Sequence, residues 1–281
     1  MPKIAIKKGS VRETLVIPLY ARYRLAQTYP ELYEGTDPGA LLEQVDYDFS
    51  EQAKLMDSAF GRYGTLEVAQ REFDLCEEAR AYLAEHPRAA VVNLGCGLLD
   101  LFGRVDNGAA QGYNLDFPEV IDVRGELMPA GERERNAACD LNDFSWMDRI
   151  DGSDGSVFFA AGVFYYFKTE EVRAIFTELS RRFPGGVVAF DSCNRTGAKM
   201  MTKTWLKGAG IRDVNALFSL DDPMSLKGWS HDFASVSTKS YMRGYRDIYP
   251  RVNAFHRLMI RFCESLVRMV IVKITFGEGD R

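Results

Sequence analysis

Hydrophobic residues follow two alternating patterns along this chain. Short apolar runs at 91–94, 156–163 and 187–190 are bounded by glycine, proline or acidic residues, as buried strands often are. Between 169 and 179 the apolar side chains instead recur every three or four positions, as they do on one face of an amphipathic helix. Strands that alternate with helices in this way predict an α/β fold with a doubly wound, mostly parallel sheet.

Further strands are predicted, and two of them carry an acidic residue at or near the end. Residues 111–116 end at Asp116, and residues 136–141 include Asp140. A last strand is expected at 270–276, where apolar side chains alternate with others. Because the carboxyl ends of parallel strands meet at one edge of a sheet, the two acids should lie at the same edge. Helical spacing of apolar residues also appears at 13–24, 65–84 and 252–266.

The strand predicted at 91–94 runs directly into Gly95-Cys96-Gly97. In open α/β sheets, ligands bind beyond the carboxyl ends of the strands, and glycine lets the backbone approach a ligand because it has no Cβ. A Gly-x-Gly also occurs in tight turns that bind nothing. Asp116 follows Gly97 by 19 positions, near the spacing at which dinucleotide-binding folds place a carboxylate for the ribose hydroxyls. It could equally cap the helix that follows.

The composition is that of an ordinary globular protein. The chain has 281 residues, of which 46% are hydrophobic and 27% charged, so we expect one elaborated domain that folds throughout. Its formal net charge of −5 argues against a nucleic-acid partner, because such proteins concentrate Lys and Arg. No apolar run approaches the ~20 residues that span a bilayer, and the amino terminus lacks a signal-peptide core. We therefore expect a cytoplasmic protein without a membrane partner.

Cysteine and histidine positions give no indication of a metal centre. The five cysteines are widely spaced, and none of them forms a Cys-x-x-Cys pair. The three histidines are also scattered along the chain. We therefore expect reduced thiols and no bound metal. The sequence does not indicate an oligomeric state.

The alternation of strands and helices divides the chain into four parts. Residues 1–64 are expected to form a helical N-terminal cover, and residues 65–195 a cofactor-binding core. Residues 196–250 break the pattern with a polar stretch rich in tyrosine, which we interpret as an inserted substrate cover. Residues 251–281 resume it with a helix and a strand that complete the core.

Several motifs occur in an order that resembles a known family. They are Glu13-Thr-Leu-Val-Ile-Pro-Leu-Tyr-Ala-Arg, Gly95-Cys96-Gly97, Asp116 within Leu-Asp-Phe-Pro-Glu-Val, Asp140-Leu141 before Phe-Ser-Trp, Gly162-Val-Phe-Tyr-Tyr-Phe, and Phe183-Pro-Gly-Gly. Together they resemble the S-adenosylmethionine-dependent leucine carboxyl methyltransferase superfamily. Within it, the nearer branch is the tetracenomycin-type polyketide O-methyltransferases. The resemblance spans most of the chain and is weakest between 195 and 249.

The resemblance implies a class I methyltransferase fold and an S-adenosylmethionine site. Gly95, Cys96 and Gly97 would lie against the methionine part of the cofactor. Arg71 matches an arginine that pairs with the cofactor carboxylate, a role suited to a planar fork of charged donors. Asp116 would bind the ribose hydroxyls.

The adenine end of the cofactor is implied to lie against two other positions. Asp140 would accept a hydrogen bond from the adenine amino group, and Leu141 would pack on the ring. Ala161 is also implied to contact the cofactor; it stands before Gly162-Val163 at the end of the strand predicted at 156–163, where relatives usually carry an acid. An alternative for Arg71, not implied by the resemblance, is a solvated charge on a helix face.

The sequence departs from the family in two places. Relatives continue the Gly-x-Gly with Leu-Asp-Thr-Arg, whereas this chain has Leu98-Leu99-Asp100-Leu101, so the polar contacts of the loop must differ. Ala161 removes a carboxylate that could contact the cofactor or the substrate. Both changes are compatible with an unusual substrate or with a non-catalytic homologue.

The implied reaction needs few catalytic groups. Methyl transfer from a sulfonium is an in-line displacement, so alignment of the reacting atoms can supply much of the rate acceleration. A carboxylate acceptor needs no base, whereas a phenol, with a pKa of ~10, benefits from one. His231 is a candidate base, and Tyr165 and Tyr166 could line the pocket of a small-molecule, polyketide-like acceptor. A nicotinamide-dependent oxidoreductase is an alternative, although the third glycine of Gly-x-Gly-x-x-Gly is replaced by Asp100.

Overall fold

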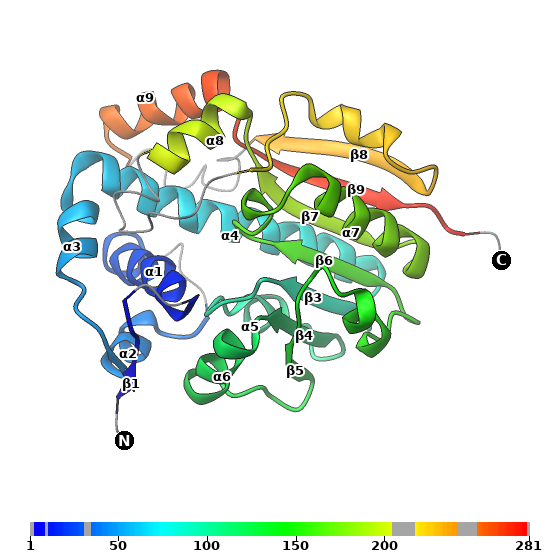
Figure 1. Ribbon diagram of the computed structural model, residues 1–281, viewed down its shortest axis with the longest axis horizontal. Helices are drawn as coiled ribbons and strands as arrows, with labels where there is room; N and C mark the ends of the chain where they lie inside the picture. Colours follow the sequence, from blue (N-terminus) through cyan, green and yellow to red (C-terminus); the bar gives the residue numbers. More distant parts are fainter. Residues whose placement is uncertain (1–2, 9–10, 31–34, 204–216, 241–251, 280–281) are drawn as a thin grey trace.

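The computed structural model describes residues 3–8, 11–30, 35–203, 217–240 and 252–279. Seven strands within these residues form one sheet in the order β5-β4-β3-β6-β7-β9-β8 (Figure 1). Strands β3 to β7 are parallel, and β9 is antiparallel to both of its neighbours. The predicted doubly wound, mostly parallel sheet is therefore confirmed. The strands are β3 (Ala90–Leu94), β4 (Gln111–Asp116), β5 (Glu134–Ala138), β6 (Ser156–Ala160), β7 (Val187–Ser192), β8 (Phe233–Ser240) and β9 (Val270–Phe276).

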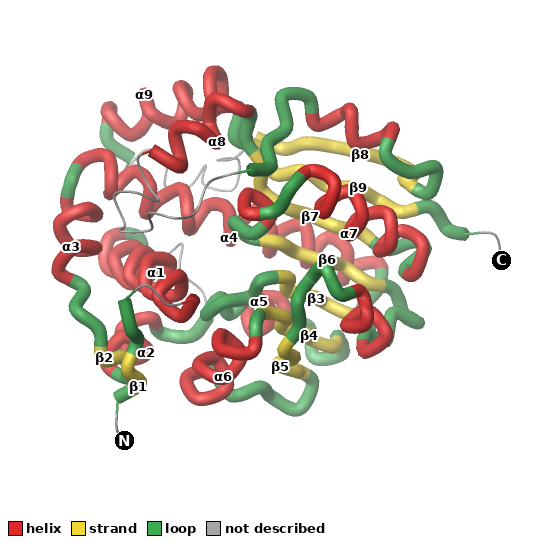
Figure 2. Tube along the Cα trace, viewed as in Figure 1, coloured by secondary structure: helices red, strands yellow, loops and turns green. Residues whose placement is uncertain are grey.

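Helices cover both faces of this sheet (Figure 2). On one face, Val91 and Phe159 of the sheet pack with Leu75 of the long helix α4. On the other face, Val92 and Phe158 pack with residues of α7 and of the short helix η3. The helices around the sheet are α4 (Ala59–Glu85), α5 (Leu101–Val105), α6 (Pro118–Leu127), η3 (Phe144–Arg149), α7 (Thr169–Arg182), η6 (Pro223–Gly228) and α9 (Ala254–Phe262).

The N-terminal segment lies beside the carboxyl ends of the parallel strands. Leu19 and Leu41 of this segment share a hydrophobic core with Val120 and Val123 of α6. Pro18 lies in the first turn of α1, where the missing N–H costs no helical hydrogen bond. The elements of this segment are β1 (Ile4–Ala5), η1 (Val11–Leu15), α1 (Val16–Thr28), α2 (Pro38–Glu43), β2 (Val45–Asp46) and α3 (Ser50–Asp57).

Three shorter elements follow β6, β7 and α9 at the same edge. They are η4 (Phe164–Tyr166), α8 (Arg195–Met201) and the π-helical turn η9 (Cys263–Val267). Tyr165 and Cys193 share a small hydrophobic cluster with Val267 of η9. Asn194 caps α8 by accepting a hydrogen bond from the N–H of Gly197 and donates one to the carbonyl of Leu266. The polypeptide thus surrounds the carboxyl edge of the sheet with segments from both ends of the chain.

Some predicted boundaries differ from the structure. The long helix begins at Ala59 rather than near residue 65, because the hydroxyl of Ser58 accepts a hydrogen bond from the N–H of Gly61 and caps it. Strand β5 ends at Ala138, so Asp140 lies in the loop after the strand.

The range 196–250, interpreted from the sequence as a cover, contains a strand of the sheet. Residues 233–240 form the edge strand β8, and of these only Phe233 and Val236 are buried. An edge strand exposes most of its side chains, so it lacks the apolar run that marked the inner strands. The structure does not describe 204–216 or 241–251, and the interpretation of those residues as a cover lies outside the described part. Among the described helices, none combines the length and apolarity that crossing a bilayer requires.

Candidate functional site

The turn after β3 approaches neighbouring segments very closely. Gly95 and Gly97 have φ angles of +61° and +48°, in the left-handed region that favours glycine. A Cβ added at Gly95 would lie 2.6 Å from Cγ2 of Val163, in the loop after β6. A Cβ at Gly97 would lie 3.3 Å from Leu15 of η1. The sequence therefore requires glycine here for the shape of the turn, whether or not a ligand is bound.

Asp116, at the end of β4, fixes this turn from the side. Its Oδ2 accepts a hydrogen bond from the N–H of Gly97 at 2.8 Å, and its Oδ1 accepts one from the N–H of Phe117 at 2.8 Å. Burial raises the pKa of Asp116, although these two N–H donors act in the opposite direction. The predicted proximity of the glycines and Asp116 is thus present, whereas α6 has no side-chain cap, so the alternative role of Asp116 as a helix cap is not seen.

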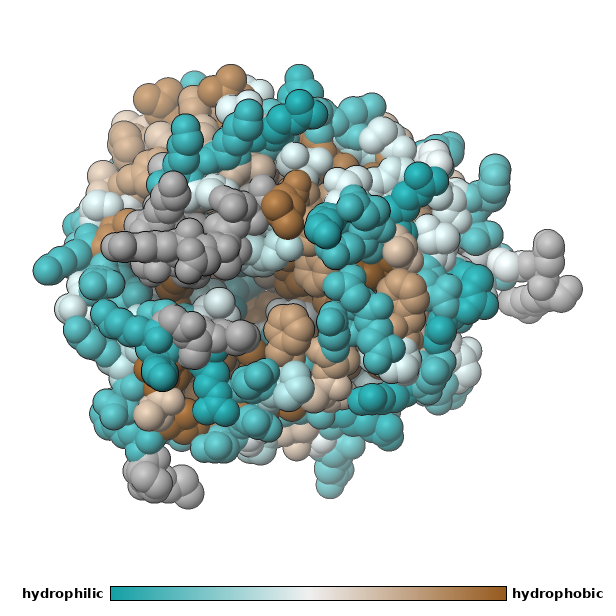
Figure 3. All heavy atoms as spheres, in the orientation of Figure 1, coloured by the Kyte–Doolittle hydropathy of each residue, from teal (hydrophilic) through white to brown (hydrophobic). Residues whose placement is uncertain are grey.

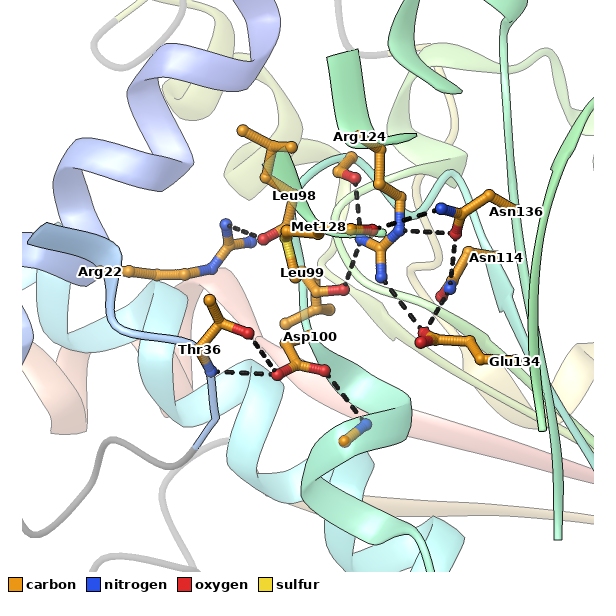
Figure 4. A network of polar contacts seen from close by, with 12 residues as sticks. Arg22, Thr36, Leu98, Leu99, Asp100, Asn114, Arg124, Met128, Glu134 and Asn136 are labelled. Carbon is orange, nitrogen blue, oxygen red and sulfur yellow. Dashed lines mark hydrogen bonds and ion pairs between the residues drawn. The ribbon is translucent and has the colours of Figure 1, made fainter. Parts of the chain in front are cut away.

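The buried side chain of Arg124 contacts the backbone of the same turn (Figure 4). The guanidinium of Arg124, on α6, is 1% exposed and donates to the carbonyl oxygens of Gly97 and Leu99 at 3.0 and 2.9 Å. It also donates to Oδ1 of Asn136 at 3.0 Å and lies 3.5 Å from a carboxylate oxygen of Glu134. A guanidinium has five N–H donors in a fixed fork, which suits several acceptors at once. Arg124 therefore holds the loop through its carbonyl oxygens, whatever side chains the loop carries.

The segment Leu98-Leu99-Asp100-Leu101, which departs from the family, has a structural role. The three leucines are buried. Asp100 caps α5 by accepting a hydrogen bond from the N–H of Gly103 at 3.1 Å. Its other oxygen accepts two hydrogen bonds from the N–H and hydroxyl of Thr36, at 3.0 and 2.8 Å. The departure therefore connects the loop to the N-terminal segment (Figure 4).

Arg71 of α4 lies at the carboxyl edge of the sheet. Its Nη1 donates to Oδ2 of Asp191, at the end of β7, at 3.3 Å. The other oxygen of Asp191 accepts a hydrogen bond from the N–H of Gly162 at 2.6 Å. Gly162 has a φ of +74°, and a Cβ there would lie 2.6 Å from Nη1 of Arg71. The side chain of Arg71 is only 16% exposed, so it is not the solvated helix-face charge considered as an alternative.

The other residues expected to contact the cofactor lie along the same edge. Asp140 is exposed, and its Oδ1 accepts a hydrogen bond from the N–H of Asn142 at 2.9 Å. Leu141 is buried, whereas Ala161 is half-buried after β6. Cys96 is also buried, and this burial raises the pKa of its thiol to about 12. A thiol in that state is not a nucleophile at neutral pH.

The two tyrosines after β6 occupy different environments. Tyr165 is 3% exposed and packs among buried residues, and its carbonyl accepts a hydrogen bond from the N–H of Leu217. Tyr166 is 43% exposed and is therefore available to a ligand. Figure 3 shows hydrophobic side chains gathered around a hollow in the middle of this face.

His231 is placed at the opposite edge of the sheet. Phe233 pairs with Phe276, at the end of β9, and the adjacent Thr275 pairs with Val187, at the start of β7. The start of β8 therefore lies at the amino ends of the parallel strands, and the exposed His231 precedes it. The prediction of His231 as a catalytic base does not agree with this placement. The sequence did not show that β9 and β8 reverse the direction of the sheet.

Glu67 is a polar residue near the carboxyl edge of the sheet that the sequence analysis did not single out. It lies on α4 one helical turn before Arg71, and its Oε1 is buried without a hydrogen-bond partner. Burial raises the pKa of Glu67 to about 7, although Tyr63, Cys263 and Arg71 act against the increase. A sequence signal existed in the spacing of Tyr63, Glu67 and Arg71, which places them on one helix face.

The strand order and the helices on both faces of the sheet define the fold class. The fold is that of the class I S-adenosylmethionine-dependent methyltransferases. Solved structures with this fold include the plantazolicin methyltransferase BpumL in complex with S-adenosylhomocysteine (TM-score 0.51, 13% identity, 96% of this chain and 100% of that one). A DUF574 family protein from Streptomyces avermitilis has a TM-score of 0.56 at 12% identity, over 91% and 96% of the two chains. The CurJ carbon methyltransferase has a TM-score of 0.54 at 11% identity, over 93% and 67%.

A characterised relative refines this assignment. The chain is 29% identical over 189 residues to the tetracenomycin polyketide synthesis O-methyltransferase TcmP of Streptomyces glaucescens, a match that covers 66% of this chain and 67% of TcmP. No protein-family profile matches the chain. The resemblance to the tetracenomycin-type O-methyltransferases that the motifs indicated is confirmed by the TcmP match.

Proposed function

We propose that this protein is an S-adenosylmethionine-dependent O-methyltransferase that acts on a hydroxyl or carboxyl group of a small molecule. The observation that carries the proposal is the convergence of the Gly95–Gly97 turn, Asp116 and Arg71 at one edge of the sheet. Open α/β sheets bind ligands at this edge. The similarity to TcmP supports the reaction class and a polyketide-like acceptor.

The residues at this edge fit the chemistry of the cofactor. Each carboxylate oxygen of Asp116 accepts one backbone hydrogen bond, and a carboxylate has about four acceptor positions, so it can also accept from ribose hydroxyls. Arg71 supplies a guanidinium for the methionine carboxylate. Asp140 and Leu141 are the residues proposed for adenine, the first through its exposed carboxylate and the second through its apolar side chain.

The chemistry requires positioning more than covalent catalysis. S-adenosylmethionine supplies an activated methyl group on a positively charged sulfur. The protein must align the acceptor oxygen with that group and exclude water, which can supply several kcal/mol of the barrier reduction, on the order of 7–11 for ideal alignment. The exposed ring of Tyr166 and the hydrophobic side chains around the hollow in Figure 3 are suited to an aromatic acceptor.

The local structure does not favour a nicotinamide cofactor. In the Gly-x-Gly-x-x-Gly fingerprint, the third glycine permits close packing next to the pyrophosphate. Here that position is Asp100, whose carboxylate is held by Thr36 and by the first turn of α5. A fixed negative charge at this position would repel a pyrophosphate.

Cofactor titration tests the proposal directly. We expect S-adenosylmethionine and S-adenosylhomocysteine to bind in isothermal titration calorimetry, and NAD to bind more weakly or not at all. Asp116→Ala should weaken binding by about 1–3 kcal/mol, the cost of leaving buried hydrogen-bond groups unsatisfied. Asp154→Ala is the matched control, because Asp154 is an exposed acid in the loop before β6.

Two results would contradict the proposal. Tighter binding of NAD than of S-adenosylmethionine would remove the cofactor assignment. Cofactor binding without methyl transfer to any of a broad set of phenols and carboxylic acids would favour the non-catalytic homologue.

A further inference from the structure

The N-terminal half of α4 projects past the carboxyl edge of the sheet toward α8 and α9 (Figure 1). Arg71 marks the level of the strand ends, because it contacts Asp191 of β7 and lies against Gly162. Glu67 precedes Arg71 by four residues and therefore lies on the same helix face, one turn farther from the sheet. The carboxyl group of Glu67 thus lies one helical turn beyond Arg71, the residue proposed to hold the cofactor carboxylate.

The groups around Glu67 come from several segments of the chain. Tyr63 and Arg71 lie on its own helix, and Cys263 reaches it from η9. Cys193, which follows β7, also interacts with it electrostatically. Of these groups, only Arg71 carries a positive charge, and Arg71 already has an ion pair with Asp191.

Oε1 of Glu67 is buried and accepts no hydrogen bond. Even with Tyr63 and Cys263 beside the carboxyl group, its ionised form is costly in such a place, because burial disfavours the charged form. The raised pKa of about 7 is the expected consequence of that burial. A group with a pKa near the operating pH is well suited to accept a proton in the transition state.

The neighbouring π-helical turn is a second unusual feature. η9 begins at Cys263, next to Glu67, and ends before Arg268, the one described non-glycine residue with a positive φ, at +51°. π-helical turns are rare and occur frequently at functional sites. The turn directs Cys263 toward Glu67 and Tyr63, with which it interacts electrostatically.

We infer that Glu67 is the proton acceptor for methyl transfer to a hydroxyl group, and that the acceptor is therefore an alcohol or phenol rather than a carboxylic acid. The inference rests on the proposed function and makes its substrate class specific. The acceptor oxygen forms a bond to the methyl carbon while the carbon–sulfur electron pair returns to sulfur. Glu67 takes the hydroxyl proton and later releases it to water. The products are a methyl ether, a neutral thioether and the regenerated carboxylate.

The kinetic test compares Glu67→Gln with the wild-type protein on two probes, 2-naphthol and 2-naphthoic acid. Glutamine keeps the shape of the side chain but cannot accept the proton. We expect kcat for 2-naphthol to fall by about 100-fold or more, the usual contribution of a general base. The wild-type rate should rise with pH through about 7, and this rise should be absent in the variant. Glu67→Asp should recover part of the rate.

The matched control is Glu77→Gln on the same helix. Glu77 is exposed and pairs with Arg80 on the surface of the helix, so its replacement should leave kcat unchanged. Wild-type methylation of 2-naphthoic acid without methylation of 2-naphthol would overturn the inference and leave the proposed function intact. The inference would also be overturned if Glu67→Gln methylated 2-naphthol with the same rate and pH profile as the wild type.

An acceptor-independent measurement completes the test. The carbonyl stretch of a protonated glutamic acid, obtained by infrared difference between the wild type and Glu67→Gln with S-adenosylhomocysteine bound, reports the ionisation of Glu67. Titration near pH 7 supports the inference, and titration below pH 5 overturns it. Failure of S-adenosylhomocysteine to bind would instead contradict the proposed function.

Discussion

The two halves of α4 differ in whether their inward-facing acids are paired with cations. Toward the sheet, Glu72 is bound by Arg22 of α1 at 2.9 Å and lies 3.4 Å from Arg104 of α5. Glu78 forms ion pairs with lysines of β8 and β9. Toward the proposed acceptor, the described residues form no ion pair with Glu67, and the nearby Arg71 is paired with Asp191. Among the described residues, the buried acids of α4 are thus paired with cations where the helix packs against the sheet. The acid nearest the proposed acceptor is not.

The pKa values follow the same division. Burial tends to raise the pKa of Glu78, but Lys239 and Lys273 outweigh burial and lower it. At Glu67 burial dominates, and the pKa rises to about 7. Natural proteins often accept such a local loss of stability at functional sites. Three substitutions on this one helix can test whether the division is real.

The largest expected effect belongs to Glu72→Ala. The substitution leaves two buried guanidiniums, 8% and 3% exposed, without their shared carboxylate. Removing one partner of a buried ion pair costs about 3–5 kcal/mol, because the remaining charge stays desolvated. Urea unfolding at pH 7 measures the loss. A loss below about 1 kcal/mol would show that these arginines find other partners and that the pairing does not stabilise this half.

Glu67→Gln should raise the stability, by about 3 kcal/mol at pH 8 at most, since a pKa increase of one unit corresponds to ~1.4 kcal/mol. The sign follows from the raised pKa. The folded state binds the proton more tightly, so the native glutamate contributes stability below its unfolded pKa of 4.5 and loses it as the pH rises through about 7.

The gain should therefore depend on pH. Urea unfolding of the wild type and Glu67→Gln at pH 5 and pH 8 measures it, and most of the gain should be absent at pH 5. A stability gain that is equal at both pH values would indicate that Glu67 titrates normally.

The smallest expected effect is that of Glu78→Gln, a loss of about 1–3 kcal/mol at pH 7. The lysine side chains are 52% and 32% exposed, so water can replace part of the lost contact. Because the pKa of Glu78 is lowered, its contribution is present above the unfolded pKa and fades as the pH falls. Urea unfolding should thus show a pH trend opposite to that of Glu67→Gln. The same trend in both variants would remove the contrast between the two halves.

The sequence predicted the parts of the fold that depend on local pattern. The strand at 111–116 was placed with its observed bounds, and the apolar face of the helix between 169 and 179 was recognised, because apolar patterning there reflects burial directly. Strand β8 was missed, since an edge strand presents mostly polar side chains such as Ser237 and Lys239. Arg124 was also missed as a buried residue. A charged side chain on an amphipathic helix is usually exposed, and its acceptors are 25 or more residues away in the loop.

Part of the candidate site was predicted from the sequence, and part of it was not. Gly95, Gly97 and Asp116 were placed together because parallel strands align their carboxyl ends, a rule that needs no side-chain detail. His231 was misplaced because its position depends on the direction of β8 and β9, which the strand pattern alone does not give. Glu67 was missed because its environment is assembled from α4, η9 and the residue after β7, which are far apart in the sequence.

The contact between Arg124 and the glycine turn bears on how this loop can change during evolution. Arg124 donates to the carbonyl oxygens of Gly97 and Leu99, and every amino acid supplies such an oxygen. The arginine can therefore hold the backbone path while the side chains at 98–101 change together with the segments they contact, as Asp100 does with Thr36 and α5 here. A family in which the arginine persists would have freedom to exchange Asp-Thr-Arg for Leu-Asp-Leu and to attach a different N-terminal segment, and with it a different acceptor, to an unchanged cofactor turn.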